Sequence, residues 1–150
     1  MALKSAIDND LKAALLGGDR FVTEVLRGLK AAILNEEVAQ GKRDEGLSDG
    51  AIEQIIAKEI KKRNESASLY DQGGRPELAD NERKESEAIK KYLPTQLTED
   101  EIKVIIDKII AELNIDSPSA MGQVIGAVKK EVGSSADGAT VAKLVKQALN

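Results

Sequence analysis

The 150-residue chain contains no cysteine, no histidine and no tryptophan. Without cysteine it has neither a disulfide framework nor thiolate chemistry. Without histidine it lacks the commonest general base and the commonest zinc ligand, so nucleophile pairs of the Ser-His or Cys-His type are excluded. Carboxylate or lysine chemistry stays open, but no motif marks a pocket for it. We therefore predict no catalytic residue, no metal site and no cofactor.

Aromatic residues and long apolar runs are also scarce. The chain has one Phe and two Tyr, which argues against the base-stacking platforms of single-strand-binding proteins. No stretch approaches the roughly eighteen apolar residues that a membrane-spanning helix requires. The N-terminal sequence MALKSAIDND lacks the apolar region of a signal peptide. We expect no membrane partner and a cytoplasmic location.

The net charge of −4 excludes a globally basic nucleic-acid binder. The charge is nevertheless unevenly distributed. Residues 95–116 carry six acidic residues and two lysines, whereas residues 117–150 carry four lysines and two acidic residues. The end of the chain is therefore a mildly basic patch beside an acidic helix. A patch this weak is typical of a solvated surface, and contact with phosphates is the sharper alternative.

Apolar residues recur every three or four positions along most of the chain, which is the spacing of helices with one buried face. The pattern predicts an all-α protein of seven helices. Four are expected in the N-terminal part, over about residues 3–16, 20–40, 49–70 and 76–93. Asp19 and Ser48 are the expected caps of the second and third helices, and Pro76 is a first-turn residue of the fourth. A charged loop, residues 41–46, follows the second helix.

Pro94 marks the boundary between two predicted domains. A proline lacks the backbone N–H and makes the preceding residue extended, so Pro94 is expected to end the fourth helix. We predict an N-terminal multi-helix domain over residues 1–94 and a small C-terminal three-helix domain over residues 95–150.

The C-terminal domain carries clear start signals. Thr98 and Glu101 form a capping box for the fifth helix. Ser117 and Pro118 are expected to cap and open the sixth, and a small-residue turn, residues 133–138, precedes the seventh. The expected buried faces are Ile102, Ile105, Ile106, Ile109, Ile110 and Leu113 on the fifth, Met121, Val124, Ile125, Val128 and Val132 on the sixth, and Val141, Leu144, Val145 and Ala148 on the seventh.

Two charged residues interrupt the apolar face of the third helix. Glu59 and Arg63 lie within about 20° of the direction of Ile52 at 100° per residue, and they are i, i+4 partners. An exposed local ion pair is the simplest interpretation. If they are buried, they need further polar partners, so we expect Arg63 to meet Glu82 or Glu85 of the fourth helix. The neighbouring Lys58, Lys61 and Lys62 are interpreted as a solvated face, with phosphate contact as the alternative.

A stripe of small residues follows one side of the sixth helix. Gly122, Gly126, Lys129 and Gly133 fall within about 60° of one another. Each glycine costs about 1 kcal/mol in a helix interior relative to alanine. Tight helix–helix packing is one explanation, and a bare surface for a sugar-phosphate backbone is the other.

The turn before the seventh helix bears on this choice. We expect the Asp137 side chain to cap the seventh helix at the N–H of Ala139 or Thr140, and we assign Asp137 and Gly138 to turn structure. A capped terminus has fewer free donors for a phosphate, so lysines are the better candidates for contact.

The chain resembles the GatB/YqeY family, in its stand-alone YqeY-like branch. The resemblance rests on residues 58–70 (KEIKKRNESASLY), residues 92–101 (YLPTQLTEDE) and residues 121–149 (MGQVIGAVKKEVGSSADGATVAKLVKQAL), in that order across nearly the whole chain. The same domain forms the C-terminal tail of the B subunit of the glutamine-dependent Asp-tRNA/Glu-tRNA amidotransferase. Nothing here resembles the catalytic cradle of that subunit. The family's C-terminal motif would fall on Met121, Gly122, Gly126, Lys129, Gly133, Asp137, Gly138, Val141 and Lys146.

The resemblance implies an all-helical protein in two parts whose C-terminal domain holds tRNA by its outer shape. We therefore expect a non-catalytic tRNA-binding module, with tRNA and a tRNA-modifying or aminoacylating enzyme as partners. One alternative is an adaptor that docks a partner helix on the glycine stripe. Another, implied by family relationship only, is an accessory to a carbon–nitrogen ligase that uses glutamine as amido donor. The expected nucleic-acid contacts are Gly122, Gly126, Lys129, Lys130, Lys143 and Lys146, and the expected structural residues are Glu59, Arg63, Pro94, Asp137 and Gly138.

Overall fold

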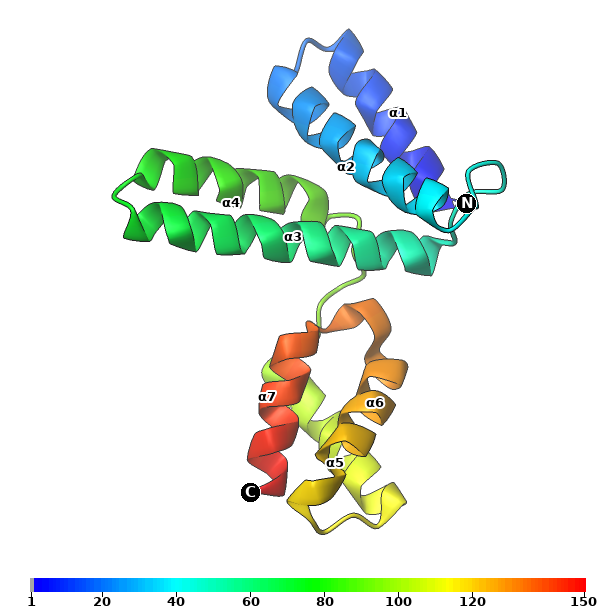
Figure 1. Ribbon diagram of the computed structural model, residues 1–150, viewed down its shortest axis with the longest axis vertical. Coiled ribbons are helices and arrows are strands. Elements are labelled where there is room, and N and C mark those ends of the chain that lie inside the picture. The colour runs from blue at the N-terminus through cyan, green and yellow to red at the C-terminus, as the bar shows by residue number, and fades with distance from the viewer. Residues whose placement is uncertain (1) are drawn as a thin grey trace. The chain divides into compact units, whose positions relative to one another are not determined.

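The computed structural model describes residues 2–150 and confirms the all-α prediction (Figure 1). Over these residues the chain forms seven α-helices and two short 3₁₀ turns, and no strand. It divides into two compact units, residues 1–93 and residues 94–150. Among the described residues, no helix is both long and apolar enough to cross a membrane.

The N-terminal unit consists of two helical hairpins, visible in Figure 1 as blue to cyan and as green ribbons. Its helices are α1 (Ala2–Leu16), α2 (Arg20–Ala39), α3 (Asp49–Gln72) and α4 (Pro76–Lys90). The predicted caps are confirmed, because the Asp19 side chain accepts a hydrogen bond from the Val22 N–H and Ser48 accepts one from the Ala51 N–H. Gly74, with φ 72°, lies in the turn between α3 and α4.

Aliphatic side chains from all four helices form the core of this unit. The buried cluster consists of Ile7, Val25, Leu26, Leu29, Ile33, Leu47, Ile52, Ile56 and Ile89. Burial of such side chains contributes about 1.5–3 kcal/mol each, so the cluster stabilises the packing of the two hairpins against each other.

Arg63 links α3 to α4 as predicted. Its Nη1 lies 2.6 Å from Glu59 Oε2, and its Nε lies 3.4 Å from Glu85 Oε2. The Arg63 side chain is only 13% exposed, so both carboxylates compensate a largely desolvated charge. Of the two predicted partners, Glu85 makes the contact. Burial, together with the nearby charge of Glu85, raises the pKa of Glu82.

The C-terminal unit is a three-helix arrangement in which α6 and α7 lie side by side in opposite directions (Figure 1). Its elements are α5 (Glu99–Leu113), the 3₁₀ turn η1 (Pro118–Ala120), α6 (Met121–Val132), the 3₁₀ turn η2 (Gly133–Ser135) and α7 (Gly138–Leu149). The capping box at Thr98 and Glu101 is confirmed. The buried core is Ile102, Ile106, Ile109, Val124, Val128, Val132, Val141, Leu144 and Val145.

Two predicted helix boundaries are wrong. Ser117 and Pro118 begin a 3₁₀ turn, and α6 starts only at Met121; the Ser117 hydroxyl accepts from the Ser119 N–H at 3.3 Å. Helix α4 ends at Lys90, before Pro94, because the chain tightens into i→i+3 bonds from Tyr92 N to Ile89 O and from Leu93 N to Lys90 O. Both departures occur at helix ends, where short 3₁₀ segments are frequent.

Three residues expected on buried faces are exposed instead. Leu113 is 39% exposed and Met121 36%, and Ala148 is also exposed. Each lies in the first or last turn of its helix, where fewer neighbouring side chains cover it.

Candidate nucleic-acid interface

The glycine stripe on α6 is open. A Cβ atom built at Gly122 or at Gly126 would meet nothing within 4 Å. Neither glycine is therefore a site of helix–helix packing within the described chain. The two positions leave a strip of bare helix backbone on the surface, which another molecule could approach closely.

Lysines border this strip on both sides. At 100° per residue, Lys129, Gly122, Gly126 and Lys130 follow one another around α6 within about 100°. Both lysines are exposed. Two ammonium groups thus flank an open segment of backbone.

Gly138, the first residue of α7, lies against the side chain of Lys129 on α6. A Cβ atom built at Gly138 would come within 3.3 Å of Lys129 Cε and 3.4 Å of Lys129 Nζ. The missing side chain makes room for the lysine to lie across the start of α7. Sequence reasoning assigned Gly138 to turn structure alone and missed this contact, because no spacing in the sequence signals it.

Asp137 occupies the N-cap of α7 as predicted. Its Oδ2 accepts hydrogen bonds from the backbone N–H and from the Oγ1 of Thr140, both at 3.2 Å. This carboxylate satisfies one of the free donors at the helix start and places a negative charge there. The positively charged groups of this region are its lysines.

Lys143 and Lys146 lie on the exposed side of α7, about 60° apart around the helix. Lys143 Nζ lies 3.6 Å from Glu99 Oε1 at the start of α5, so its charge is partly offset. Lys129, Lys130 and Lys146 form no ion pair with the acidic residues of the described chain. All six predicted contact residues are exposed on the α6–α7 hairpin, and Lys129, which lies against Gly138, reaches from one helix to the other. We call the set Gly122, Gly126, Lys129, Lys130, Lys143 and Lys146 the α6–α7 face.

The segment after Pro94 holds the turn between α6 and α7. Gln96 Nε2 donates to the carbonyl oxygens of Pro94 and Ser134, both at 2.9 Å, and Leu97 N donates to Ser135 O at 2.8 Å. In the sequence this segment is interpreted as a domain boundary and as part of the motif, residues 92–101, that carries the family resemblance. In the structure its hydrogen bonds also hold the 3₁₀ turn η2, which connects α6 to α7.

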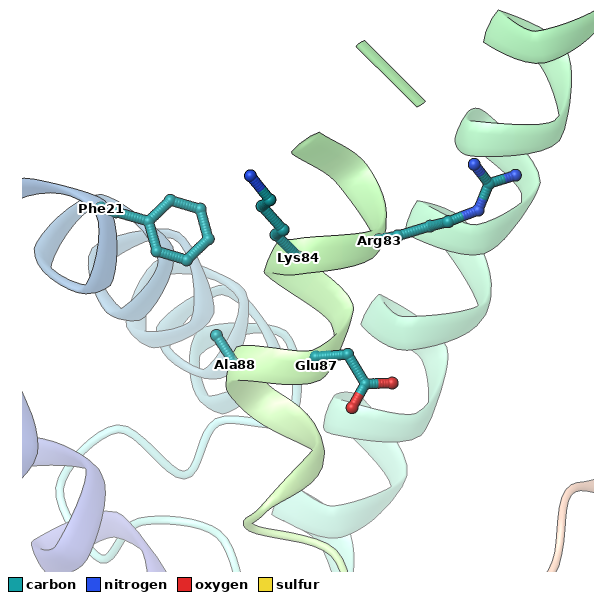
Figure 2. A pocket seen from close by; sticks show the side chains of 5 residues that line it. All are labelled: Phe21, Arg83, Lys84, Glu87 and Ala88. Atoms are coloured by element: carbon teal, nitrogen blue, oxygen red, sulfur yellow. The ribbon is translucent and has the colours of Figure 1, made fainter. Parts of the chain in front are cut away.

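No catalytic or metal-binding cluster is evident in the part of the chain that the structure describes. Over residues 2–150, no three acidic side chains come together closely enough to hold a metal ion. A shallow concavity of about 510 Å³ lies between α2 and α4. Figure 2 shows the Phe21 ring turned toward Lys84 and Ala88, with Arg83 and Glu87 directed to the other side of α4. The walls of this concavity offer no convergent polar groups of the kind that hold a substrate.

These observations describe an all-helical protein of two units with an open, lysine-bordered helix surface. The family of Yqey-like proteins matches residues 4–149, so the chain belongs to the YqeY family. This agrees with the resemblance noted in the sequence.

Two curated relatives carry the name "Altered inheritance of mitochondria protein 41, mitochondrial". The protein from Clavispora lusitaniae is 28% identical over 137 residues, which is 89% of this chain and 78% of the relative. The protein from Lachancea thermotolerans is 34% identical over 128 residues, which is 83% of this chain and 65% of the relative. Both matches therefore extend over most of this chain and through both of its units.

Proposed function

We propose that the C-terminal unit binds structured RNA through the α6–α7 face and that the chain catalyses no reaction on it. The observation that carries this proposal is the open space at Gly122 and Gly126 between two exposed lysines. A glycine backbone lets a sugar-phosphate chain approach closely, and lysine ammonium groups neutralise phosphates. Transfer RNA is the RNA that the similarity to the amidotransferase tail favours.

The composition of the face suits recognition by shape. Structured RNA is recognised largely through its backbone and 2′-hydroxyl groups, which requires no aromatic stacking platform. The C-terminal unit carries eight acidic residues and six lysines, and six of the acidic residues lie within residues 95–116. Electrostatic attraction between this unit and RNA phosphates is therefore confined to the α6–α7 face.

A charge-reversal experiment tests the proposal. The double variant Lys129→Glu/Lys146→Glu should lose binding to a transfer-RNA transcript, measured by fluorescence anisotropy at low salt. The matched control is Lys58→Glu/Lys61→Glu, which makes the same charge change on exposed positions of α3. Equal loss in both variants would show that net charge alone governs binding and would contradict the proposal.

Crosslinking in a cell extract separates RNA binding from the adaptor alternative. Sequencing of crosslinked RNA should recover transfer RNA with the wild-type chain and not with the double variant. Recovery of a protein partner that survives nuclease treatment, without RNA, would instead support docking of a partner helix on the same surface.

The cytoplasmic location stays a prediction. The two curated relatives are named as mitochondrial proteins. Imaging of the tagged chain in its native cell would decide between the two compartments.

A further inference from the structure

A second candidate site lies in the N-terminal unit, between α1 and α2. A cavity of about 300 Å³ is lined by residues of both helices. Its volume is at the lower end of the range for small-molecule pockets, about 300–1,000 Å³. The lining residues that matter here are Lys4, Ile7 and Asp8 of α1 and Lys30, Leu34 and Glu37 of α2.

Two ion pairs that join α1 to α2 line the cavity. Lys4 Nζ lies 2.7 Å from Glu37 Oε1, and Lys30 Nζ lies 2.7 Å from Asp8 Oδ1. Lys4 and Asp8 are four residues apart on α1, which corresponds to about 6 Å along the helix. Helix α1 supplies the cation in the first pair and the anion in the second. The cavity thus has a cation and an anion at each end and no net charge.

Glu37 is the most deeply buried of the four charged side chains. Its side chain is 1% exposed, whereas its partner Lys4 is 37% exposed. Among residues 2–150, Glu37 Oε2 accepts no hydrogen bond; only Oε1 does. A buried carboxylate requires compensation by opposite charge and hydrogen bonds. Lys4 supplies this compensation to Glu37 Oε1 at 2.7 Å.

The space between the ion pairs is apolar. Ile7 is buried at 1% exposure, and Leu34, at 44%, forms a partly exposed wall. Because the members of each ion pair already neutralise one another, a ligand that adds no net charge fits the cavity best. A short hydrocarbon with both an ammonium and a carboxylate meets this condition and can contact both kinds of lining charge, whereas a pure cation or anion would add an uncompensated charge.

We propose that the α1–α2 cavity binds a small zwitterion of amino-acid size with an aliphatic side chain. The ligand ammonium donates to Glu37, its carboxylate accepts from Lys30, and its hydrocarbon contacts Ile7 and Leu34. Lys4, at 37% exposure, can move away from Glu37 or donate to the carboxylate of the ligand. This site is independent of the α6–α7 face and of RNA binding.

Amide chemical shifts of the full chain test the proposal, with L-leucine as the probe. Millimolar L-leucine should shift resonances of the lining residues. Isoamylamine, which lacks the carboxylate, and isocaproate, which lacks the ammonium, should each bind at least about tenfold more weakly, because a hydrogen bond to a charged group contributes at least this much. No shift with L-leucine, or equal binding of the three compounds, would overturn the proposal.

Two variants locate the site. Leu34→Trp fills the cavity from its exposed wall and should abolish binding, whereas Leu69→Trp makes the same change at a 66% exposed position of α3 and should leave binding intact. Glu37→Gln should weaken binding at least about tenfold by removing the charged acceptor. Unchanged binding by Leu34→Trp would contradict the assignment even if Glu37→Gln failed to fold.

Discussion

Replacing Gly126 by alanine separates the two explanations of the glycine stripe. Gly126 lies inside α6, and a Cβ atom there would meet nothing within 4 Å. Alanine is favoured over glycine in a helix interior by about 1 kcal/mol, partly because it restricts the unfolded chain. Gly126→Ala should therefore raise the free energy of unfolding of the C-terminal unit by about 1 kcal/mol. For a unit of this size, that corresponds to a rise in Tm of about 4–8 °C.

The same change should act in the opposite direction on RNA. A methyl group at Gly126 keeps a sugar-phosphate backbone away from the helix, so the affinity for transfer RNA should fall a few-fold while stability rises. Circular dichroism during heating and anisotropy with a labelled transcript measure the two quantities.

Gly133→Ala is the matched control in the same unit. Gly133 ends α6 with φ 54°, a conformation that only glycine adopts without strain. Alanine there should destabilise by about 1–3 kcal/mol. If Gly126→Ala also destabilised the unit, the space beside Gly126 would be occupied and the reasoning about an open surface would be refuted.

Two further predictions concern the N-terminal unit. Arg63→Ala leaves Glu59 and Glu85 without their shared cation and should lower the free energy of unfolding by about 3 kcal/mol in urea denaturation; a loss below about 1 kcal/mol would mean that the network is solvated. The hydrogen bond from Tyr92, followed by that from Lys91, lowers the pKa of Asp10 below its ordinary 3.8. The resulting stabilisation is present above pH 3.8 and is lost as pH falls through the lowered value. Tyr92→Phe should therefore lose less stability on acidification across that range than the wild type, and identical acid denaturation curves would count against this contact.

Local signals in the sequence predicted the helices well. Asp19, Ser48, Thr98 and Asp137 each cap the helix that was expected, because a cap depends on residues within one turn. The Arg63–Glu85 contact was also predictable, since charges within an apolar stripe require a partner on the facing helix.

Contacts between elements were less accessible to sequence reasoning. The placement of Lys129 over Gly138 depends on how α6 and α7 pack. The Gln96 contact with Ser134 joins positions far apart in sequence. The α1–α2 cavity depends on how the side chains of two helices pack together, which no periodicity in the sequence reveals.

The salt dependence of transfer-RNA binding tests the central claim most directly. Each phosphate neutralised by a lysine contributes about −0.9 to the slope of log affinity against log salt concentration, so the four lysines of the α6–α7 face allow a slope no steeper than about −3.6. We expect a clearly negative slope for the wild-type chain, made shallower by about one for each of Lys129 and Lys146 in the double variant. A flat response, or a slope unchanged by the two substitutions, would contradict binding of RNA through the α6–α7 face.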